Sequence, residues 1–95
     1  MEFEWDASTE AENLRKHKIS FAEAVESFYD PAGFVVVDVR HSEVEQRFYW
    51  IGKSSSDRVI TTRFTRRGAK IRIIGSAEWR EFRKALQSPM RKTVA

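Results

Sequence analysis

Residues 47–74 read RFYWIGKSSSDRVITTRFTRRGAKIRII. This stretch holds three runs rich in β-branched and aromatic residues, 47–53, 59–64 and 70–74, separated by a serine-rich loop and by a short turn at Gly68. Such runs predict β-strands, and connections this short favour an antiparallel meander. A similar run at 34–40 precedes them and predicts one more strand of the same sheet.

Helix signals lie before these strands. Asp6 or Ser8 is placed to cap a first helix that ends near His17. Ser20 followed by Glu23 forms a capping-box pattern, which predicts a second helix over the apolar positions 21, 24, 25 and 28. Residues 30–33, which read DPAG, end that helix because proline disfavours helix at the residue before it.

Two further elements are predicted at the ends of the chain. Met1, Phe3 and Trp5 alternate with acidic residues, which is typical of a short half-buried strand. Ser76 is placed to cap a last helix in which residues 79, 82 and 86 share one apolar face. The sequence therefore predicts an α+β fold, with N-terminal helices and a C-terminal helix packed on a mainly antiparallel sheet of four to five strands.

Length and composition limit the class of protein. A chain of 95 residues that is 41% hydrophobic and 33% charged fits one globular domain, residues 1–95, and we expect residues 88–95 to form a flexible tail. There is no cysteine and there are only two histidines, so we expect no disulfide, no metal site and no cofactor. The acidic start lacks the apolar run of a signal peptide, and we expect a cytoplasmic protein without a membrane span.

Charge is divided unevenly along the chain. Residues 1–46 contain 4 Lys/Arg and 11 Asp/Glu, a net charge of −7, whereas residues 47–95 contain 13 Lys/Arg and 3 Asp/Glu, a net charge of +10. Such asymmetry suggests a surface that binds a polyanion, with nucleic acid as the first candidate and an acidic protein as the second. A merely solvated charged surface is the alternative.

The strand register predicts where the arginines lie. If Arg67 and Gly68 form a two-residue turn, Arg63 lies opposite Arg72, and an anion between them would relieve their repulsion. A four-residue serine turn would place Trp50, with Phe48, on the face that carries Arg63. The opposite face would then form the core under the helices and collect Ile51, Ile60, Phe64, Ile71 and Ile73. Alternatively, both arginines pair with carboxylates from the acidic half.

The available side chains suit phosphodiester chemistry on RNA. There is no phosphate-binding glycine loop and no nucleophile elbow, but guanidinium groups are clustered. In RNA the attacking 2′-hydroxyl belongs to the substrate, so the protein has to orient it and stabilise the charge that develops on phosphate. Trp50 is placed either to stack on a base or to fill the core, and His17 and His41 either transfer protons or serve local structural roles.

The chain resembles BrnT-type toxins of bacterial type II toxin–antitoxin systems, in the RelE/ParE-like superfamily. The resemblance rests on an ordered set of short pieces that extends across most of the chain. These pieces are residues 3–6, 13–21, 30–31, 41–43 with Glu45 and Arg47, 51–52, 57–58, 64–65 and 71–74.

The resemblance implies a RelE-like fold with helices on one face of the sheet and the activity of an endoribonuclease that blocks translation. It also implies a BrnA-type antitoxin with a DNA-binding domain, so that operator DNA is contacted only through the toxin–antitoxin complex. The chain departs from the family pattern at Glu78, where an arginine is expected, and at Arg66, where many relatives have an acidic residue. It also lacks the tyrosine that often ends the last helix.

Two sets of site residues follow. The matched positions imply that Arg58 and Arg72 bind phosphate or the transition state, and the charge pattern and histidine chemistry add Arg63, Lys53 and His17 as catalytic candidates. The candidates for RNA binding are Arg66, Arg67, Arg80, Arg83, Lys84 and Trp50.

Two other functions remain open for the sequence. The same basic surface would serve a binding module without catalysis, and a toxin of this fold could act on a DNA-processing enzyme instead of RNA.

Overall fold

The computed structural model describes residues 1–41 and 45–87, so the predicted tail at 88–95 lies outside the described residues. The elements follow the predicted order and are linked by short connections. They are β1 (Glu2–Glu4), α1 (Ala7–His17), α2 (Phe21–Ser27), β2 (Phe34–Asp38), a 3₁₀ turn η1 (Val39–His41), β3 (Arg47–Lys53), β4 (Val59–Arg67), β5 (Lys70–Ala77) and α3 (Arg80–Gln87).

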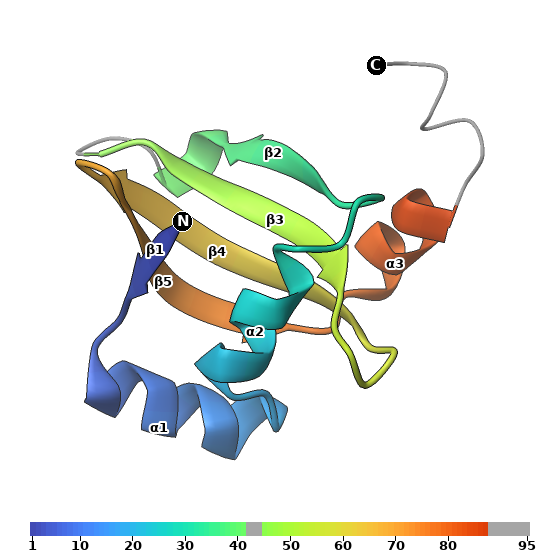
Figure 1. The fold of residues 1–95 in the computed structure, drawn as a ribbon, viewed down its shortest axis with the longest axis horizontal. Coiled ribbons are helices and arrows are strands. Elements are labelled where there is room, and N and C mark those ends of the chain that lie inside the picture. Colours follow the sequence, from blue (N-terminus) through green and yellow to red (C-terminus); the bar gives the residue numbers. More distant parts are fainter. Residues whose placement is uncertain (42–44, 88–95) are drawn as a thin grey trace.

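The strands form one five-stranded sheet in the order β1-β5-β4-β3-β2 (Figure 1). Strand β1 runs parallel to β5, and all other neighbours are antiparallel. The predicted α+β class and the mainly antiparallel sheet are therefore confirmed. The predicted caps of the first two helices also hold, because the Asp6 carboxylate accepts a hydrogen bond from the Thr9 N–H at 3.0 Å and the Ser20 hydroxyl accepts one from the Glu23 N–H at 3.1 Å.

Helices cover both faces of the sheet, which corrects the expectation of one covered face. On one face, Phe28 at the end of α2 packs against Phe64 and Ile71. On the other face, Leu86 of α3 packs against Ile51 and Val59. Ile51 therefore does not share a core with Phe64 and Ile71, because successive residues of a strand point to opposite faces and the serine loop sets a different register from the one predicted.

That loop is five residues long, and Lys53 pairs with Val59 instead of Arg58. The Ser54 N–H donates to the Arg58 carbonyl at 2.9 Å, and Asp57 closes the turn in the left-handed region with φ 67°. A shift of one residue moves every side chain of a strand to the other face. This is why the sequence-based register assigned several strand residues to the wrong side.

Trp50 is one of these residues, and it does not share a face with Arg63. Its ring stacks on Phe28 with centroids 5.3 Å apart, and its Nε1 donates to the Ser27 carbonyl at 2.7 Å. Gly52 lies under the same turn of α2, where a Cβ atom would come 2.3 Å from the Ser27 oxygen. Trp50 is thus part of the core beneath α2.

The β4–β5 hairpin also differs from its predicted register. Its turn residues are Gly68, with φ 61°, and Ala69, so that Arg67 pairs with Lys70. An irregularity between Arg63 and Phe64 then places Arg63 opposite Gly75. The predicted cross-strand pair of Arg63 with Arg72 does not form, since Arg72 lies opposite Thr65.

Strand β5 is longer than predicted, and this changes the role of Ser76. Ser76 lies inside β5 instead of capping α3. Its N–H donates to the Asn13 side-chain oxygen at 3.0 Å. Strand β1 pairs only with Lys70–Arg72 at the start of β5. The rest of that edge of β5 has no strand beside it in the described ranges, and α1 packs there.

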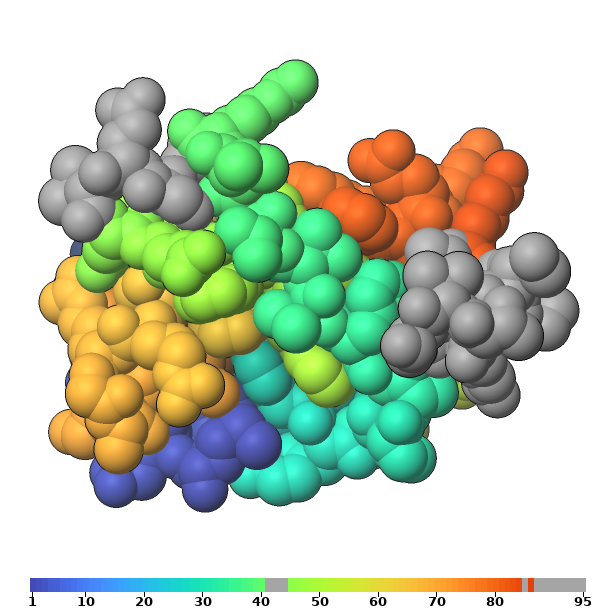
Figure 2. All heavy atoms as spheres, turned by 90° about the horizontal axis from the view of Figure 1, so that it is seen from above, coloured from blue at the N-terminus to red at the C-terminus, as the bar shows by residue number. Residues whose placement is uncertain are grey.

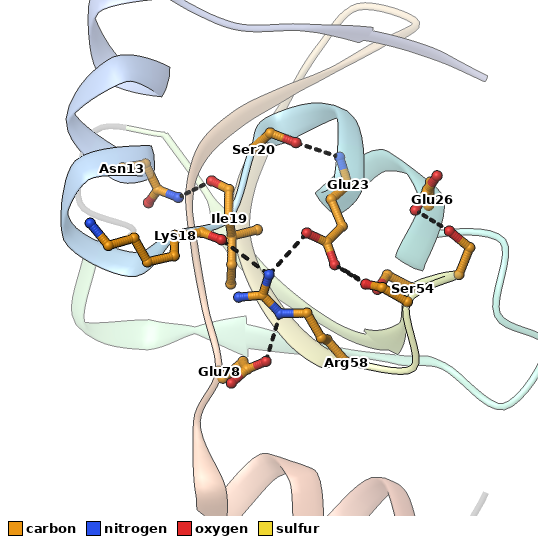
Figure 3. Close-up of polar contacts among 11 residues, drawn as sticks. Asn13, Lys18, Ile19, Ser20, Glu23, Glu26, Ser54, Arg58 and Glu78 are labelled. Carbon is orange, nitrogen blue, oxygen red and sulfur yellow. Dashed lines mark hydrogen bonds and ion pairs between the residues drawn. The ribbon is translucent and has the colours of Figure 1, made fainter.

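Arg58 joins three separate segments of the chain (Figure 3). It donates to the Lys18 carbonyl at 3.0 Å, to Glu23 at 3.2 Å and to Glu78 at 2.8 Å. Glu23 also accepts hydrogen bonds from the hydroxyls of Ser54 and Ser56. The corner between α1 and α2 is thereby tied to the serine loop and to the β5–α3 connection.

These contacts shift the titration of both charged groups. Burial alone would raise the pKa of Glu23, but hydrogen bonds from Ser56 and Ser54 and the charge of Arg58 outweigh it, and the pKa lies below its ordinary value. The pKa of Arg58 is raised, mainly by its hydrogen bond to Glu78 and against the effect of burial, with further contributions from the charges of Glu23 and Glu78.

A Glu23→Gln variant tests this cluster. Because the folded-state pKa of Glu23 lies below its ordinary value of 4.5, ionised Glu23 stabilises the fold above that value and loses its contribution as the pH falls through the folded-state pKa. We expect Glu23→Gln to lower the free energy of unfolding by about 1.5 kcal/mol at neutral pH and to lose less stability than the wild type on acidification.

Urea denaturation at a series of pH values measures both effects. Glu26→Gln is the control, since Glu26 is an exposed carboxylate on the same helix that accepts a hydrogen bond from the Ser55 hydroxyl. A Glu23→Gln variant whose stability falls with acid as steeply as that of the wild type would contradict the assignment.

Candidate active site

A cleft of about 190 Å³ opens near the middle of the sheet, on the face that carries α3. It is formed by the C-terminal half of α1, by β3, β4 and β5, and by the connection between β5 and α3. We call it the central cleft. Its lining residues are Asn13, His17, Tyr49, Thr61, Arg63, Gly75, Ser76, Ala77 and Trp79.

His17 is placed at the cleft by the docking of α1 on β5. Asn13 is 8% exposed and uses both ends of its amide, donating to the Ile19 carbonyl at 3.0 Å and accepting from the Ser76 N–H at 3.0 Å. His17 follows four residues later and so lies on the same side of the helix. The docked side of α1 therefore carries an exposed imidazole to the rim of the cleft.

Arg63 reaches the cleft from β4, where its neighbour across the strand is Gly75. One of its terminal nitrogens donates to the Tyr49 hydroxyl at 3.2 Å, and its guanidinium carbon lies 5.5 Å from the centroid of the same ring. Its Nε lies 3.6 Å from a carboxylate oxygen of buried Asp38. These contacts hold the half-buried guanidinium of Arg63 beside Gly75, which has no side chain to oppose it.

Thr61 supplies a polar atom without a partner. The residue is 3% exposed, and its hydroxyl is a buried group that has no hydrogen-bond partner in the described part of the protein. Buried polar groups are nearly always hydrogen-bonded, so an unsatisfied hydroxyl on a cleft wall is a candidate contact for a ligand or a water molecule. The hydroxyl can donate to a phosphate oxygen or to a base.

Two aromatic rings close the end of the cleft nearest to α3. The rings of Tyr49 and Trp79 have centroids 5.1 Å apart at an interplanar angle of 54°. Trp79 also stacks on Phe82 of α3, with centroids 5.5 Å apart. The central cleft thus combines an imidazole, a guanidinium, a hydroxyl and an aromatic wall.

The structure brings His17 and Arg63 together and places the other candidates elsewhere. Arg58, Arg80 and Arg83 line a neighbouring pocket at the α3 end. Arg67 and Arg72 line a third pocket towards the β4–β5 hairpin, where Arg72 donates to Glu4 at 3.0 Å and Arg67 lies 3.6 Å from Glu45.

The remaining candidates lie outside these three sites. Lys53 is 3.2 Å from Asp57 at the serine loop, and Trp50 lies in the core beneath α2. Arg66 and Lys84 are exposed, and no ion pair involves either of them in the described part of the chain.

Pairing between the two halves of the chain explains the uneven charge. Carboxylates of the acidic half bind cations of the basic half, as in the Glu23–Arg58, Asp38–Arg63 and Glu4–Arg72 pairs. In the described part of the basic half, the exposed cations without an ion pair are Arg66 at the β4–β5 hairpin and Arg80, Arg83 and Lys84 on α3. These two elements lie at opposite ends of the molecule (Figure 2), so these cations form separate groups and not one continuous basic face.

Sequence reasoning missed the four residues that supply the other polar and aromatic side chains discussed above, Asn13, Tyr49, Thr61 and Trp79. The sequence predicted Asn13 to be part of the first helix and Trp79 to lie on the apolar face of the last helix. Tyr49 and Thr61 follow from strand alternation once the correct register is known, because Tyr49 pairs with Arg63 and Thr61 lies two residues before it. The missing information was the register, which depends on loop geometry.

No helix in the described ranges has both the length and the apolar character needed to cross a membrane. Within the same ranges, no group of three or more His, Asp or Glu side chains is arranged to hold a metal ion.

Two comparisons with known proteins bear on the family of this chain. A search of curated proteins finds no matching relative. The model of a protein family described as the ribonuclease toxin BrnT of type II toxin–antitoxin systems matches residues 5–82, which is most of the chain and includes every residue that lines the central cleft. The chain therefore belongs to the BrnT family of ribonuclease toxins, as its sequence resemblance implied.

Proposed function

We propose that this ribonuclease toxin cleaves RNA in the central cleft. The observation that carries the proposal is the convergence of His17 and Arg63 on one cleft whose wall holds the unpartnered Thr61 hydroxyl. A proton acceptor, a phosphate-binding fork and a second hydrogen-bond donor are the groups that in-line attack on a phosphodiester requires.

The reaction uses the 2′-hydroxyl of the substrate as nucleophile. His17 takes the proton of that hydroxyl, the bond between O2′ and phosphorus forms, the bond between phosphorus and O5′ breaks, and solvent protonates the leaving O5′. Arg63 binds the non-bridging oxygens, on which negative charge increases, and Thr61 donates to one of them. The aromatic wall of Tyr49 and Trp79 gives a neighbouring base a surface for stacking.

Arg58 and Arg72 have a different role in this proposal from the one that the resemblance implied. Neither lines the central cleft, and both bind carboxylates of the acidic half. Arg72 lies opposite Thr65, which is two residues along β4 from Arg63, and its ion pair with Glu4 ties β5 to β1. Arg58 mainly orders the segments that surround the cleft.

A type II toxin acts together with an antitoxin partner. We propose that this partner is BrnA-like, that it neutralises the toxin by binding it, and that operator DNA is bound only through their complex. Cleavage of cellular RNA by the free toxin would inhibit translation in the cytoplasm. The competing hypothesis is that the protein binds RNA without cutting it. Three sets of variants distinguish cleavage from binding alone.

The first variant is Arg63→Lys, which keeps the positive charge beside Asp38 but removes the planar fork. We expect kcat/KM for RNA cleavage to fall about 100-fold while the protein stays folded. The assay is cleavage of total RNA, with and without ribosomes, by toxin separated from its antitoxin. Arg40→Lys, at an exposed position away from the cleft, is the matched control, and equal activity of the two variants would exclude Arg63 from the site.

A second variant, His17→Gln, tests proton transfer. Loss of the imidazole should lower kcat about 100-fold or more with little effect on RNA binding. The pH–rate profile is the decisive measurement, because it should lose the limb that the imidazole contributes. A slower enzyme with an unchanged pH profile would show that His17 has only a structural role.

A third pair of variants, Thr61→Val and Thr62→Val, separates function from stability. Thr61 has no hydrogen bond to lose, so Thr61→Val should leave the free energy of unfolding unchanged or slightly raised and should lower cleavage about 10-fold. Thr62 bonds to Ser76 at 3.0 Å on the opposite face, so Thr62→Val should lower stability by about 1 kcal/mol and leave cleavage unchanged. Thermal melts and cleavage rates provide the comparison, and a Thr61→Val enzyme with full activity would remove Thr61 from the mechanism.

A further inference from the structure

A second pocket, of about 280 Å³, lies at the α3 end of the sheet. We call it the arginine pocket. It is lined by Asp57, Arg58, Val59, Glu78, Trp79, Arg80 and Arg83.

The carboxylates of this pocket have ion-pair partners, whereas two of its arginines have none within the described residues. Both carboxylates are already paired, Asp57 with Lys53 at 3.2 Å and Glu78 with Arg58 at 2.8 Å. Arg80 and Arg83 are exposed, and no ion pair involves either of them in the described part of the chain. They are three residues apart on α3, so their side chains leave the helix on the same side. An anion entering the pocket therefore meets two guanidinium groups with free hydrogen-bonding capacity.

The pocket adjoins the central cleft. Trp79 lines both cavities and so forms the wall between them. A strand of RNA whose scissile phosphate lies at Arg63 can pass the Trp79 ring and place a flanking phosphate in the arginine pocket. A base can stack on the Trp79 ring only if it is not paired within a duplex. This favours single-stranded RNA, whose bases are free to stack on aromatic side chains.

The third pocket offers no comparable site. There, Arg72 and Arg67 each face a carboxylate, Glu4 and Glu45, and Asp6 is also part of the lining. A phosphate at that position would have to displace existing ion pairs. Arg66 of the hairpin has no ion pair in the described part of the chain, but it lines none of these pockets. The pocket-lining cations without an ion pair therefore favour an RNA path from the central cleft towards α3.

We propose that the arginine pocket is a second phosphate subsite for single-stranded RNA, formed by Arg80 and Arg83, and that Glu78 restrains its affinity. The proposal rests on RNA cleavage in the central cleft and extends it to a neighbouring nucleotide. Glu78 accepts the hydrogen bond of the Arg58 Nε and places a negative charge at the pocket wall (Figure 3). Without that charge, Arg58 is available to the same phosphate while Glu23 and the Lys18 carbonyl still hold it in place.

The first test compares substrates of two lengths. The probes are a dinucleoside monophosphate, which fills only the central cleft, and a single-stranded hexanucleotide, which also reaches the arginine pocket. An Arg80→Ala/Arg83→Ala variant should bind the hexanucleotide about 10-fold more weakly and bind the short probe as the wild type does. The slope of log affinity against log salt concentration for the hexanucleotide should decrease by about 0.7 for each lost phosphate contact.

The charge-matched control is Arg15→Ala/Arg40→Ala, which removes two exposed cations that line neither cavity. Equal weakening by the control and by the Arg80/Arg83 variant would overturn the proposal, because the effect would then be one of net charge. Equal weakening for the short and long probes would overturn it as well.

The second test is a gain of affinity, which misfolding cannot produce. Glu78→Gln should tighten hexanucleotide binding about threefold to tenfold and leave the short probe unaffected. Glu81→Gln makes the same change of charge on α3 at a residue outside the arginine pocket and should have little effect. No gain with Glu78→Gln, or the same gain with Glu81→Gln, would show that Glu78 does not restrain the subsite.

Binding and cleavage are measured separately, so the two proposals can fail separately. If the wild type cuts neither probe but the Arg80/Arg83 variant loses hexanucleotide affinity as described, the cleavage proposal fails and the subsite stands. If both probes are cut normally by that variant and its RNA affinity is unchanged, the subsite fails. The subsite also fails if the variant loses affinity for the antitoxin alone, since α3 would then serve the protein partner.

Discussion

The arrangement of the cleft depends on the buried amide of Asn13. Its two hydrogen bonds, to the Ile19 carbonyl and to the Ser76 N–H, satisfy backbone groups in two distant parts of the chain. The first bond closes the corner between α1 and α2, and the second replaces a missing strand at the free part of the β5 edge. Because an unsatisfied buried backbone group costs about 1–3 kcal/mol, this amide fixes the position of α1 and with it the position of His17.

The acidic and basic halves of the chain are joined by ion pairs. Carboxylates from the first half neutralise arginines on the strands, and this leaves α3 and the hairpin end as regions with unpaired cations in the described part of the protein. Arg63 is one of the paired arginines, yet it lies at the cleft, where its partner Asp38 is buried and its terminal nitrogen is bound to a phenol. Ion pairing therefore orients the guanidinium of Arg63 while leaving space in front of it.

The departure from the family pattern at Glu78 has a direct structural counterpart. Where the resemblance led us to expect an arginine, Glu78 binds Arg58 and reduces the positive charge beside α3. Arg80 and Arg83 restore cationic groups within the same pocket from the first turn of the helix. The substitution thus changes which side chains are free to meet an anion, while the sheet, the cleft and the α1 docking remain in place.

Local signals in the sequence were sufficient for the order of the helices and strands and for the caps of α1 and α2, because a capping side chain or an alternating strand acts within a few residues. The caps at Asp6 and Ser20 and the order of the elements are of this kind. The predicted cap of α3 was wrong, since Ser76 lies inside β5. His17 and Arg63, which the structure places at one cleft, were among the candidates chosen from the chemistry of their side chains. The grouping of site residues was not determined locally, since it depends on strand register.

Register was decided by the tertiary structure. The left-handed backbone at Asp57 lengthens the serine loop by one residue, and the irregularity at Arg63 places that arginine opposite Gly75 instead of Arg72. A shift of one residue reverses the face of a whole strand, so small differences in turn geometry moved Trp50 into the core and Tyr49 to the cleft. The sequence by itself determined the elements and the kinds of side chain available, whereas packing of the helices on both faces of the sheet decided which of them meet.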